Sequence, residues 1–185
     1  RWYKGAALEE IRNKELLRKV SQGDEAAFAS LYEETRMDIF AFALSILKNY
    51  HDAEDVMQEV FLKVKLQAGS CRNFENVSGW LIRVTKNTAL DFIRKKRDVI
   101  DGDLAGENLR TEEESTIADH SVFINQLFHE LRDEERQIVV LHLIADLTHK
   151  TIAKTLNLPL TTVKWRYRKA ILHLEKISKE KEWEL

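Results

Sequence analysis

The stretch THKTIAKTLNLPLTTVKWRYRKAILHL, residues 148–174, predicts a short helix, a tight turn and a longer basic helix. Thr148 is a good N-cap, because its hydroxyl can accept a hydrogen bond from a free N–H of the first turn. Asn157 stands where the chain must turn sharply and tolerates a left-handed backbone. Pro159 suits the first turn of the next helix. This layout is typical of a helix-turn-helix, whose second helix enters the DNA major groove.

The apolar and polar faces of these two helices agree with that prediction. Ile152, Ala153 and Leu156 form the inner face of the first helix. The second helix has an apolar stripe at steps of 4, 3, 4 and 3, made by Val163, Tyr167, Ala170, Leu174 and Ile177. Its opposite side carries groups that reach phosphates and base edges, namely Thr161, Thr162, Lys164, Trp165 and Arg168. A helical hairpin with a merely solvated basic face is the alternative.

Composition points to an all-α protein. The chain has 185 residues with one Pro and six Gly, so long helices are little interrupted. The sequence contains no alternating runs of β-branched residues of the kind that would indicate strands.

The single Cys71 excludes an internal disulfide and a Cys-rich zinc site, and fits a reducing cytoplasm. We expect no membrane insertion, because no apolar run approaches about 18 residues. No metal-spaced or nucleophile-base set is present, so we expect no catalytic residues, no metal and no cofactor.

Charge divides the chain into two basic parts separated by acidic sequence. Residues 61–97 hold nine basic and two acidic residues, and residues 148–181 again hold nine and two. Between them, residues 98–119 hold eight acidic residues and one Arg, with few apolar side chains. Such a segment buries too little surface to offset its ordering entropy. We therefore predict two small helical domains, residues 1–97 and 120–185, joined by a flexible acidic linker.

Four helices are expected in the first domain. The first covers roughly residues 8–21, and Asp24 caps a long second helix that ends near Leu47. The third begins at His51-Asp52. After a loop at residues 69–76, Ser78 caps a fourth helix that ends near Arg97. In the second domain, helices at residues 121–131 and 133–144 support the helix-turn-helix.

The third helix carries an acidic face. Asp52, Asp55 and Glu59 recur at steps of 3 and 4, and Gln58 and Phe61 flank them. An acidic, partly apolar helix surface is suited to dock a basic helical partner. An ordinary solvated acidic face is the alternative.

The fourth helix has a different stripe, in which Arg83, Asn87, Asp91 and Arg94 or Lys95 share one side. Basic side chains there can bind phosphates, and Asn87 can read a base edge. In the preceding loop, Phe74 stands beside Arg72 and Asn73 and is a candidate to stack on an unpaired base. Burial of the Phe74 side chain in the core is an equal alternative.

Taken together, these segments resemble the group IV, or extracytoplasmic-function (ECF), sigma factors of bacterial RNA polymerase. The resemblance covers about residues 23–176. It is carried by DEAAFASLYEE (24–34), DAEDVMQEVFLKV (52–64), WLIRVTKNTALDFIRKKR (80–97), LRDEERQIVVL (131–141) and the helix-turn-helix. In this family the two domains are called regions 2 and 4, and there is no enzyme active site. Trp165 departs from the family, where that position is usually small.

The resemblance implies a role for each face. Asp52, Asp55, Gln58, Glu59 and Phe61 would contact core RNA polymerase at the β′ clamp helices, and region 4 would lie at the β flap. Residues at the −10 promoter element would be Arg72, Asn73, Phe74, Arg83, Asn87, Arg94 and Lys95. Residues at the −35 element would be Thr161, Thr162, Lys164, Trp165 and Arg168. An anti-sigma factor is a further implied partner. The rival hypothesis is a helix-turn-helix regulator that acts on promoter DNA without polymerase.

Overall fold

The structure, a computed structural model, describes residues 3–70, 76–102 and 130–181. Its first half consists of α1 (Tyr3–Val20), α2 (Glu25–Leu47), α3 (Tyr50–Gln67), a 3-10 turn (Ala68–Ser70) and α4 (Val77–Gly102). Its second half consists of α6 (Asp133–Leu143), α7 (His149–Leu156) and α8 (Leu160–Lys181). No strand occurs in these three ranges, so the predicted all-α class is confirmed.

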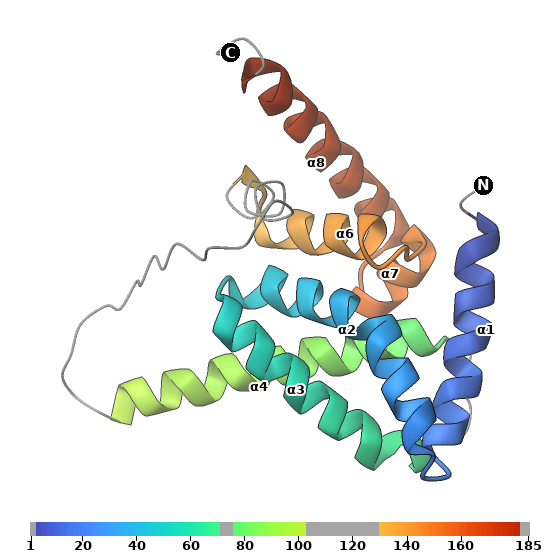
Figure 1. Cartoon of the computed structure of the whole chain (residues 1–185). Helices are drawn as coiled ribbons and strands as arrows, with labels where there is room; N and C mark the ends of the chain where they lie inside the picture. The colour runs from blue at the N-terminus through green and yellow to red at the C-terminus, as the bar shows by residue number, and fades with distance from the viewer. Residues whose placement is uncertain (1–2, 71–75, 103–129, 182–185) are drawn as a thin grey trace.

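The first four helices form a bundle, visible in Figure 1 as α1, α2 and α3 against the long α4. Asp24 caps α2 as predicted, since its carboxylate accepts from the Ala27 N–H at 2.9 Å. The third helix begins earlier than predicted, because Asn49 is its cap and accepts from the Asp52 N–H. The bundle core is built from fully buried aliphatic side chains of different helices, such as Leu17, Leu31 and Val56.

Helix α4 is longer than the predicted helix, which was expected to end near Arg97. It continues to Gly102, so residues 98–102 are helical. Its length is explained by the sequence, because no Gly or Pro interrupts residues 80–101. The rest of the predicted linker and the helix predicted at residues 121–131 lie almost entirely outside the described residues.

The second half confirms the local prediction for residues 148–174. The Thr148 hydroxyl accepts from the Thr151 N–H at 3.2 Å and caps α7. Asn157 is left-handed, at φ 57° and ψ 47°. Pro159 directly precedes α8, and its carbonyl accepts from the Val163 N–H at 3.1 Å. In the expected α8 stripe, Val163 and Ala170 are fully buried, and Tyr167 is partly buried.

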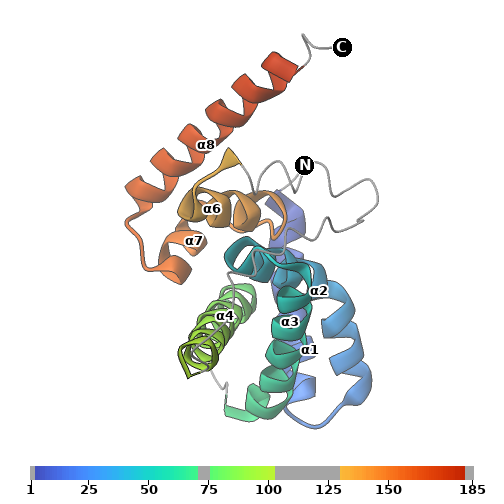
Figure 2. The ribbon, with the colours of Figure 1, turned by 90° about the vertical axis from the view of Figure 1, so that its left-hand side faces the viewer.

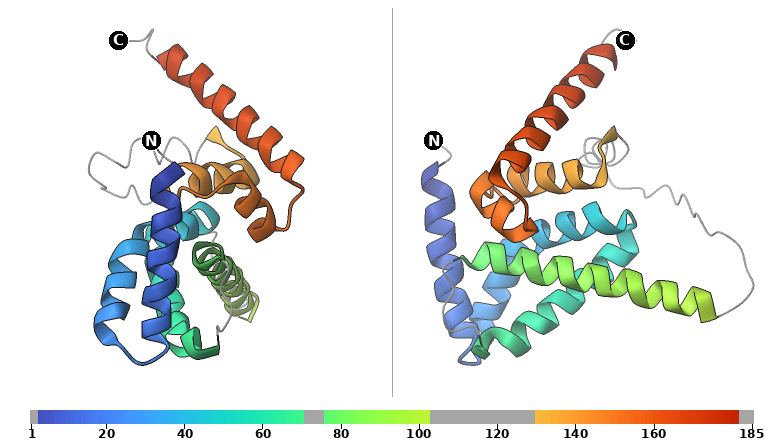
Figure 3. Two further views of the ribbon diagram at one scale, coloured as in Figure 1. Left: turned by 90° about the vertical axis from the view of Figure 1, so that its right-hand side faces the viewer. Right: turned by 180° about the vertical axis from the view of Figure 1, so that it is seen from behind.

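The two halves are packed against each other through a common core. Ala41 and Phe42 of α2 and Ile82 of α4 join Ile138 of α6 and Ile152 of α7 in one cluster of buried side chains. Figure 2 shows α6 over α2 and α7 beside α4. Figure 3 shows α8 extending away from the remainder of the molecule. The first and second halves therefore contact directly, which was not predicted from a tether between separate domains.

Candidate polymerase and promoter interface

The acidic face of α3 lies largely at the surface. Asp55 and Gln58 are exposed, and half-buried Glu59 pairs with Lys63 at 2.8 Å within the same helix. Asp52 is less accessible, since only 18% of its side chain is exposed and both carboxylate oxygens accept from the Lys96 ammonium of α4. Asp55 and Gln58 are therefore the two predicted docking residues with the freest side chains.

Phe61, predicted to flank this face, is instead a core residue. It is only 4% exposed and packs against Tyr32, with 4.6 Å between ring centroids, and edge-on against Phe28 at 6.3 Å. Burial of an aromatic side chain between α2 and α3 is more favourable than its exposure beside carboxylates. Phe61 thus supports the helix from beneath.

Two leucines on α3 were missed as candidate surface residues. Leu62 is 63% exposed and Leu66 is 83% exposed. They continue the line of Asp55 and Gln58 at steps of four, so the exposed stripe changes from acidic to apolar along the helix. In the sequence, their spacing of four and eight residues from Gln58 already indicated that they share its side of the helix.

The predicted DNA face of α4 is also accessible. Arg83, Asn87, Arg94 and Lys95 are all exposed. Asp91 pairs with Arg94 one turn away, as expected for an acidic residue that orients a neighbouring guanidinium. The candidate loop residues Arg72, Asn73 and Phe74 lie outside the described residues.

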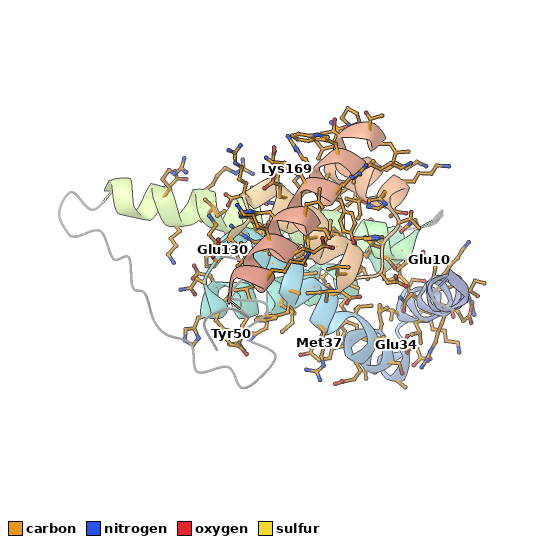
Figure 4. All side chains as sticks on the ribbon, turned by 90° about the horizontal axis from the view of Figure 1, so that it is seen from above. Glu10, Glu34, Met37, Tyr50, Glu130 and Lys169 are labelled. Atoms are coloured by element: carbon orange, nitrogen blue, oxygen red, sulfur yellow. The ribbon has the colours of Figure 1, made fainter. Side chains whose placement is uncertain are left out.

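The beginning of α4 is held by side chains that the sequence prediction did not select. The Asn76 amide oxygen accepts from the Gly79 N–H at 2.5 Å, so Asn76 is the cap instead of Ser78. Glu10 of α1 accepts from the Val77 N–H and from the Ser78 hydroxyl, the latter at 2.8 Å. Figure 4 shows Glu10 on α1 near the beginning of α4. A carboxylate is favourable here, because free N–H groups and the helix dipole make this end positive.

The predicted −35 face lies on α8. Thr161, Lys164, Trp165 and Arg168 are exposed, and Thr162 is half-buried. Trp165 is 62% exposed, with the Lys169 ammonium 5.4 Å from its ring centroid. Lys169 also pairs with Glu135 of α6 at 3.1 Å, which links α8 to α6. An exposed aromatic ring beside three cations gives this face both apolar and phosphate-binding capacity.

Beneath this face lies a cluster of three aromatic rings, one from each helix of the second half. The His142 and His149 rings stack at 4.3 Å, and Tyr167 meets both edge-on at 4.6 and 4.8 Å. Burial lowers the pKa of His149, and the nearby His142 and Lys164 lower it further. His142 is oriented by the Leu147 carbonyl, 2.8 Å from its Nδ1. The three rings therefore pack between α6, α7 and α8.

The described residues contain no group of three or more His, Cys, Asp or Glu side chains that could hold a metal ion. Within the same ranges, no helix is long and apolar enough to cross a membrane.

Comparison with known proteins matches a family model in each half of the chain. Residues 31–99 match the family model for sigma-70 region 2, and residues 127–176 match that for sigma-70 region 4. The chain is 31% identical over 171 residues to the ECF RNA polymerase sigma factor SigW of Bacillus subtilis, covering 85% of this chain and 91% of that protein.

Two solved structures have a similar fold. One is CnrH in complex with the cytosolic domain of CnrY, with a TM-score of 0.64 and 19% identity, covering 91% of this chain and 98% of that chain. The other is the sigma factor RpoE with the anti-sigma factor NepR from Bartonella quintana, with a TM-score of 0.64 and 22% identity, covering 82% and 96% of the two chains. With both regions present in order and a relative matched along nearly its whole length, this chain belongs to the ECF sigma factors of the sigma-70 family.

Proposed function

We propose that this protein binds core RNA polymerase and directs transcription from promoters that it selects through their −35 and −10 elements. The observation that carries the proposal is the order of three exposed faces within one ECF sigma chain. These are the acidic-to-apolar stripe of α3, the basic stripe of α4 and the basic helix of a helix-turn-helix. The first suits a protein surface, and the other two suit nucleic acid.

The α3 stripe is the proposed contact with the β′ clamp helices, centred on Asp55 and Gln58. Asp52 and Glu59 lie on the same side but are already paired with Lys96 and Lys63. Exposed carboxylates steer a basic partner and determine its register more than they contribute affinity. The apolar end at Leu62 and Leu66 adds surface that a partner can bury.

Promoter contacts are assigned to the two halves according to the form of the DNA. Capture of a base at a melted −10 element requires that the base be unstacked, which costs about 2 to 3 kcal/mol. We assign this capture to the loop before α4, together with Arg83 and Asn87. Arg94 and Lys95 would bind phosphates. Reading of a duplex −35 element requires a rigid helix in the major groove, which α8 supplies.

Trp165 is proposed to affect promoter choice. Its exposed ring can contact a thymine methyl group, which is an apolar feature of the major groove. A change from Trp165 to Ser would alter which −35 sequences are used, with little effect on folding.

An anti-sigma factor is proposed as a further partner. The similar structures of CnrH and RpoE were both solved in complex with a second protein, described for RpoE as an anti-sigma factor. A pull-down with candidate anti-sigma domains, followed by inhibition of transcription, would test this.

A run-off assay with core polymerase and a library of promoters tests the main proposal. We expect transcription from a subset of promoters that share −35 and −10 motifs, and none from core enzyme alone. Sequence-specific duplex binding by the isolated protein, without initiation from any template, would instead support a polymerase-independent regulator.

Asp55→Arg tests the docking face. We expect loss of core binding, at least roughly tenfold, because a cation would face a basic partner surface. Glu33→Arg on α2 is the matched control, since this exposed carboxylate lies off the α3 stripe. Wild-type affinity for Asp55→Arg would remove the proposed face.

Lys164→Ala tests the assignment of the two DNA faces. We expect weaker use of the −35 element and unchanged opening on a template whose −10 region is already melted. An equal defect on both templates would contradict the assignment.

A further inference from the structure

The ring of Trp165 lies beside an ion pair that joins α8 to α6. The Lys169 ammonium, one turn further along α8, is 5.4 Å from the centroid of this ring. The same ammonium is 3.1 Å from a carboxylate oxygen of Glu135 on α6. Figure 4 shows the position of Lys169 on α8. Glu135, Lys169 and Trp165 therefore form a chain of contacts from the first turn of α6 to the face of α8 proposed to read the −35 element.

Glu135 is the fixed end of this chain of contacts. It is only 8% exposed, although glutamate is seldom buried. Its place in the first turn of α6 suits a negative charge, because free N–H groups make that end of a helix positive. A buried carboxylate without a cation is costly, so Glu135 holds the Lys169 ammonium in place. A long side chain that would otherwise sample many rotamers is thereby kept beside the indole.

A neighbouring ion pair joins the same two helices on another side of α8. The Arg166 guanidinium lies 2.6 Å from a carboxylate oxygen of Glu134, and 23% of the Arg166 side chain is exposed. Around α8, Arg166 is displaced from Trp165 by about 100°, whereas Lys169 is displaced from it by about 40°. The Glu134–Arg166 pair therefore attaches α8 to α6 without supporting the ring. The Glu135–Lys169 pair does both.

The position of the Lys169 charge affects what α8 can recognise. A lysine that is free to reach phosphates adds affinity for every DNA sequence alike. A lysine paired with a carboxylate adds less of this general attraction. An indole held in one orientation also loses less side-chain entropy when it meets a base edge. Both effects increase the share of binding that depends on the base sequence.

We propose that Glu135 is a positioning residue for readout of the −35 element. Through Lys169 it fixes the Trp165 ring toward a base edge, and it withholds the Lys169 charge from the DNA backbone. The base feature recognised is a thymine methyl group, because this is the apolar group that the major groove presents. The inference rests on the proposed function for the identity of the DNA that α8 reads.

Fluorine NMR of the protein labelled with 5-fluorotryptophan reports the position of the ring without DNA or polymerase. The Trp165 signal is identified by its loss in Trp165→Ser. Glu135→Gln is the test variant, and Glu134→Gln is the matched control, because it removes the carboxylate of the neighbouring ion pair. We expect Glu135→Gln to shift the Trp165 signal toward its position in urea, and Glu134→Gln to leave it in place. An unshifted signal in Glu135→Gln would overturn the proposal.

Replacement of single thymines by deoxyuridine measures the contact with DNA, because it removes only the methyl group. The probe is a promoter duplex recovered from the run-off library and bound by the holoenzyme, with each thymine of the −35 element replaced in turn. In the parent and in Glu134→Gln, we expect one replacement to weaken binding about fourfold, as for one buried methyl group. Glu135→Gln should lose most of this penalty. An equal penalty in Glu135→Gln and the parent would overturn the proposal.

Salt dependence and a conservative variant distinguish positioning from a merely structural role. In Glu135→Gln, the released Lys169 can bind a phosphate, so the slope of log affinity against log salt should steepen by about one. Lys169→Arg should keep the thymine penalty of the parent, and Lys169→Met should lose it, which also keeps the test valid if Glu135→Gln folds poorly. Equal thymine penalties in Lys169→Arg and Lys169→Met would show that the ion pair only holds α8 on α6.

The two readouts also separate this inference from the proposed function. If the holoenzyme uses no promoter, the role in −35 readout fails with the proposed function, while the fluorine signal still decides whether Glu135 positions the ring. If promoters are used but no thymine replacement weakens binding by the parent, only the inference fails.

Discussion

Arg136 is a charged side chain with 2% exposure at the junction of α2 and α6. Its guanidinium donates to the Leu131 carbonyl at 2.8 Å and to the Ser45 carbonyl, and it pairs with Asp133 at 3.2 Å. Burial lowers the pKa of Arg136, and Asp133 opposes that shift. A planar group with several donors can serve carbonyls from two halves of the chain at once.

Arg136→Met is expected to destabilise the protein by about 2 to 4 kcal/mol, because buried carbonyls lose a charged donor. Arg132→Met is the control, since Arg132 is exposed and its side chain makes no capping bond. Urea unfolding followed by circular dichroism measures both. If Arg136→Met lowers the free energy of unfolding no more than the control does, the guanidinium contributes no net stability.

The stacked His142–His149 pair predicts sensitivity to acid. The pKa of His149 lies below its ordinary value of 6.5, mainly through burial, so its neutral form is favoured in the folded state. The resulting stability is present above pH about 6.5 and is lost as pH falls through the lowered folded-state pKa. Protonation would also place a second cation beside Lys164.

His149→Phe is expected to reduce this pH dependence while keeping an aromatic ring in the stack. Comparing urea midpoints at about pH 7.5 and about pH 5.5 gives the change for each protein. The wild type should lose more stability than His149→Phe between these conditions. Equal losses would show that other groups cause the acid sensitivity.

At the scale of elements, α4 depends on a distant carboxylate for its first turn. Asn76 is its local cap, and Glu10 of α1 serves the next N–H groups from 67 and 68 residues away. The loop proposed to capture the −10 element ends at this turn. The orientation of that loop should therefore depend on α1.

Glu10→Ala is expected to destabilise the protein by about 1 to 2 kcal/mol and to weaken −10 fork binding in the holoenzyme. Glu15→Ala is the matched control on α1, because its exposed carboxylate pairs only within the helix, with Arg18 and Lys19. Thermal unfolding and fork binding should be measured on the same samples. Normal fork binding by Glu10→Ala would show that α1 does not orient the loop.

For the whole molecule, the shared core predicts that the two halves unfold together. Phe42 is fully buried in a cluster that contains Ile138, Ile152 and Val163 of the second half. Domains that share a core lose their packing in one cooperative transition.

Phe42→Ala is expected to cost about 3 to 5 kcal/mol and to divide the single calorimetric transition into two. Val60→Ala is the control, since this buried residue belongs to the core of the first half alone. It should lower the transition temperature while leaving one transition. Two separate transitions in the wild type would contradict cooperative unfolding of the shared core.

The sequence by itself determined the features that depend on neighbours along the chain. The caps Asp24 and Thr148, the left-handed turn at Asn157 and the polar faces of α3 and α8 follow from spacing within a few residues. The two sigma-70 regions were identifiable for the same reason, because their motifs are local.

Tertiary structure alone decided which side chains meet across the chain. It buried Phe61 beneath the docking face, and it placed Arg136 on a carbonyl 91 residues away. It also set α7 on the beginning of α4 and so closed the two halves on each other. Periodicity gives the direction of a side chain from its helix but not the helix that it will contact. That choice depends on how whole apolar faces pack, which is a property of the assembled molecule.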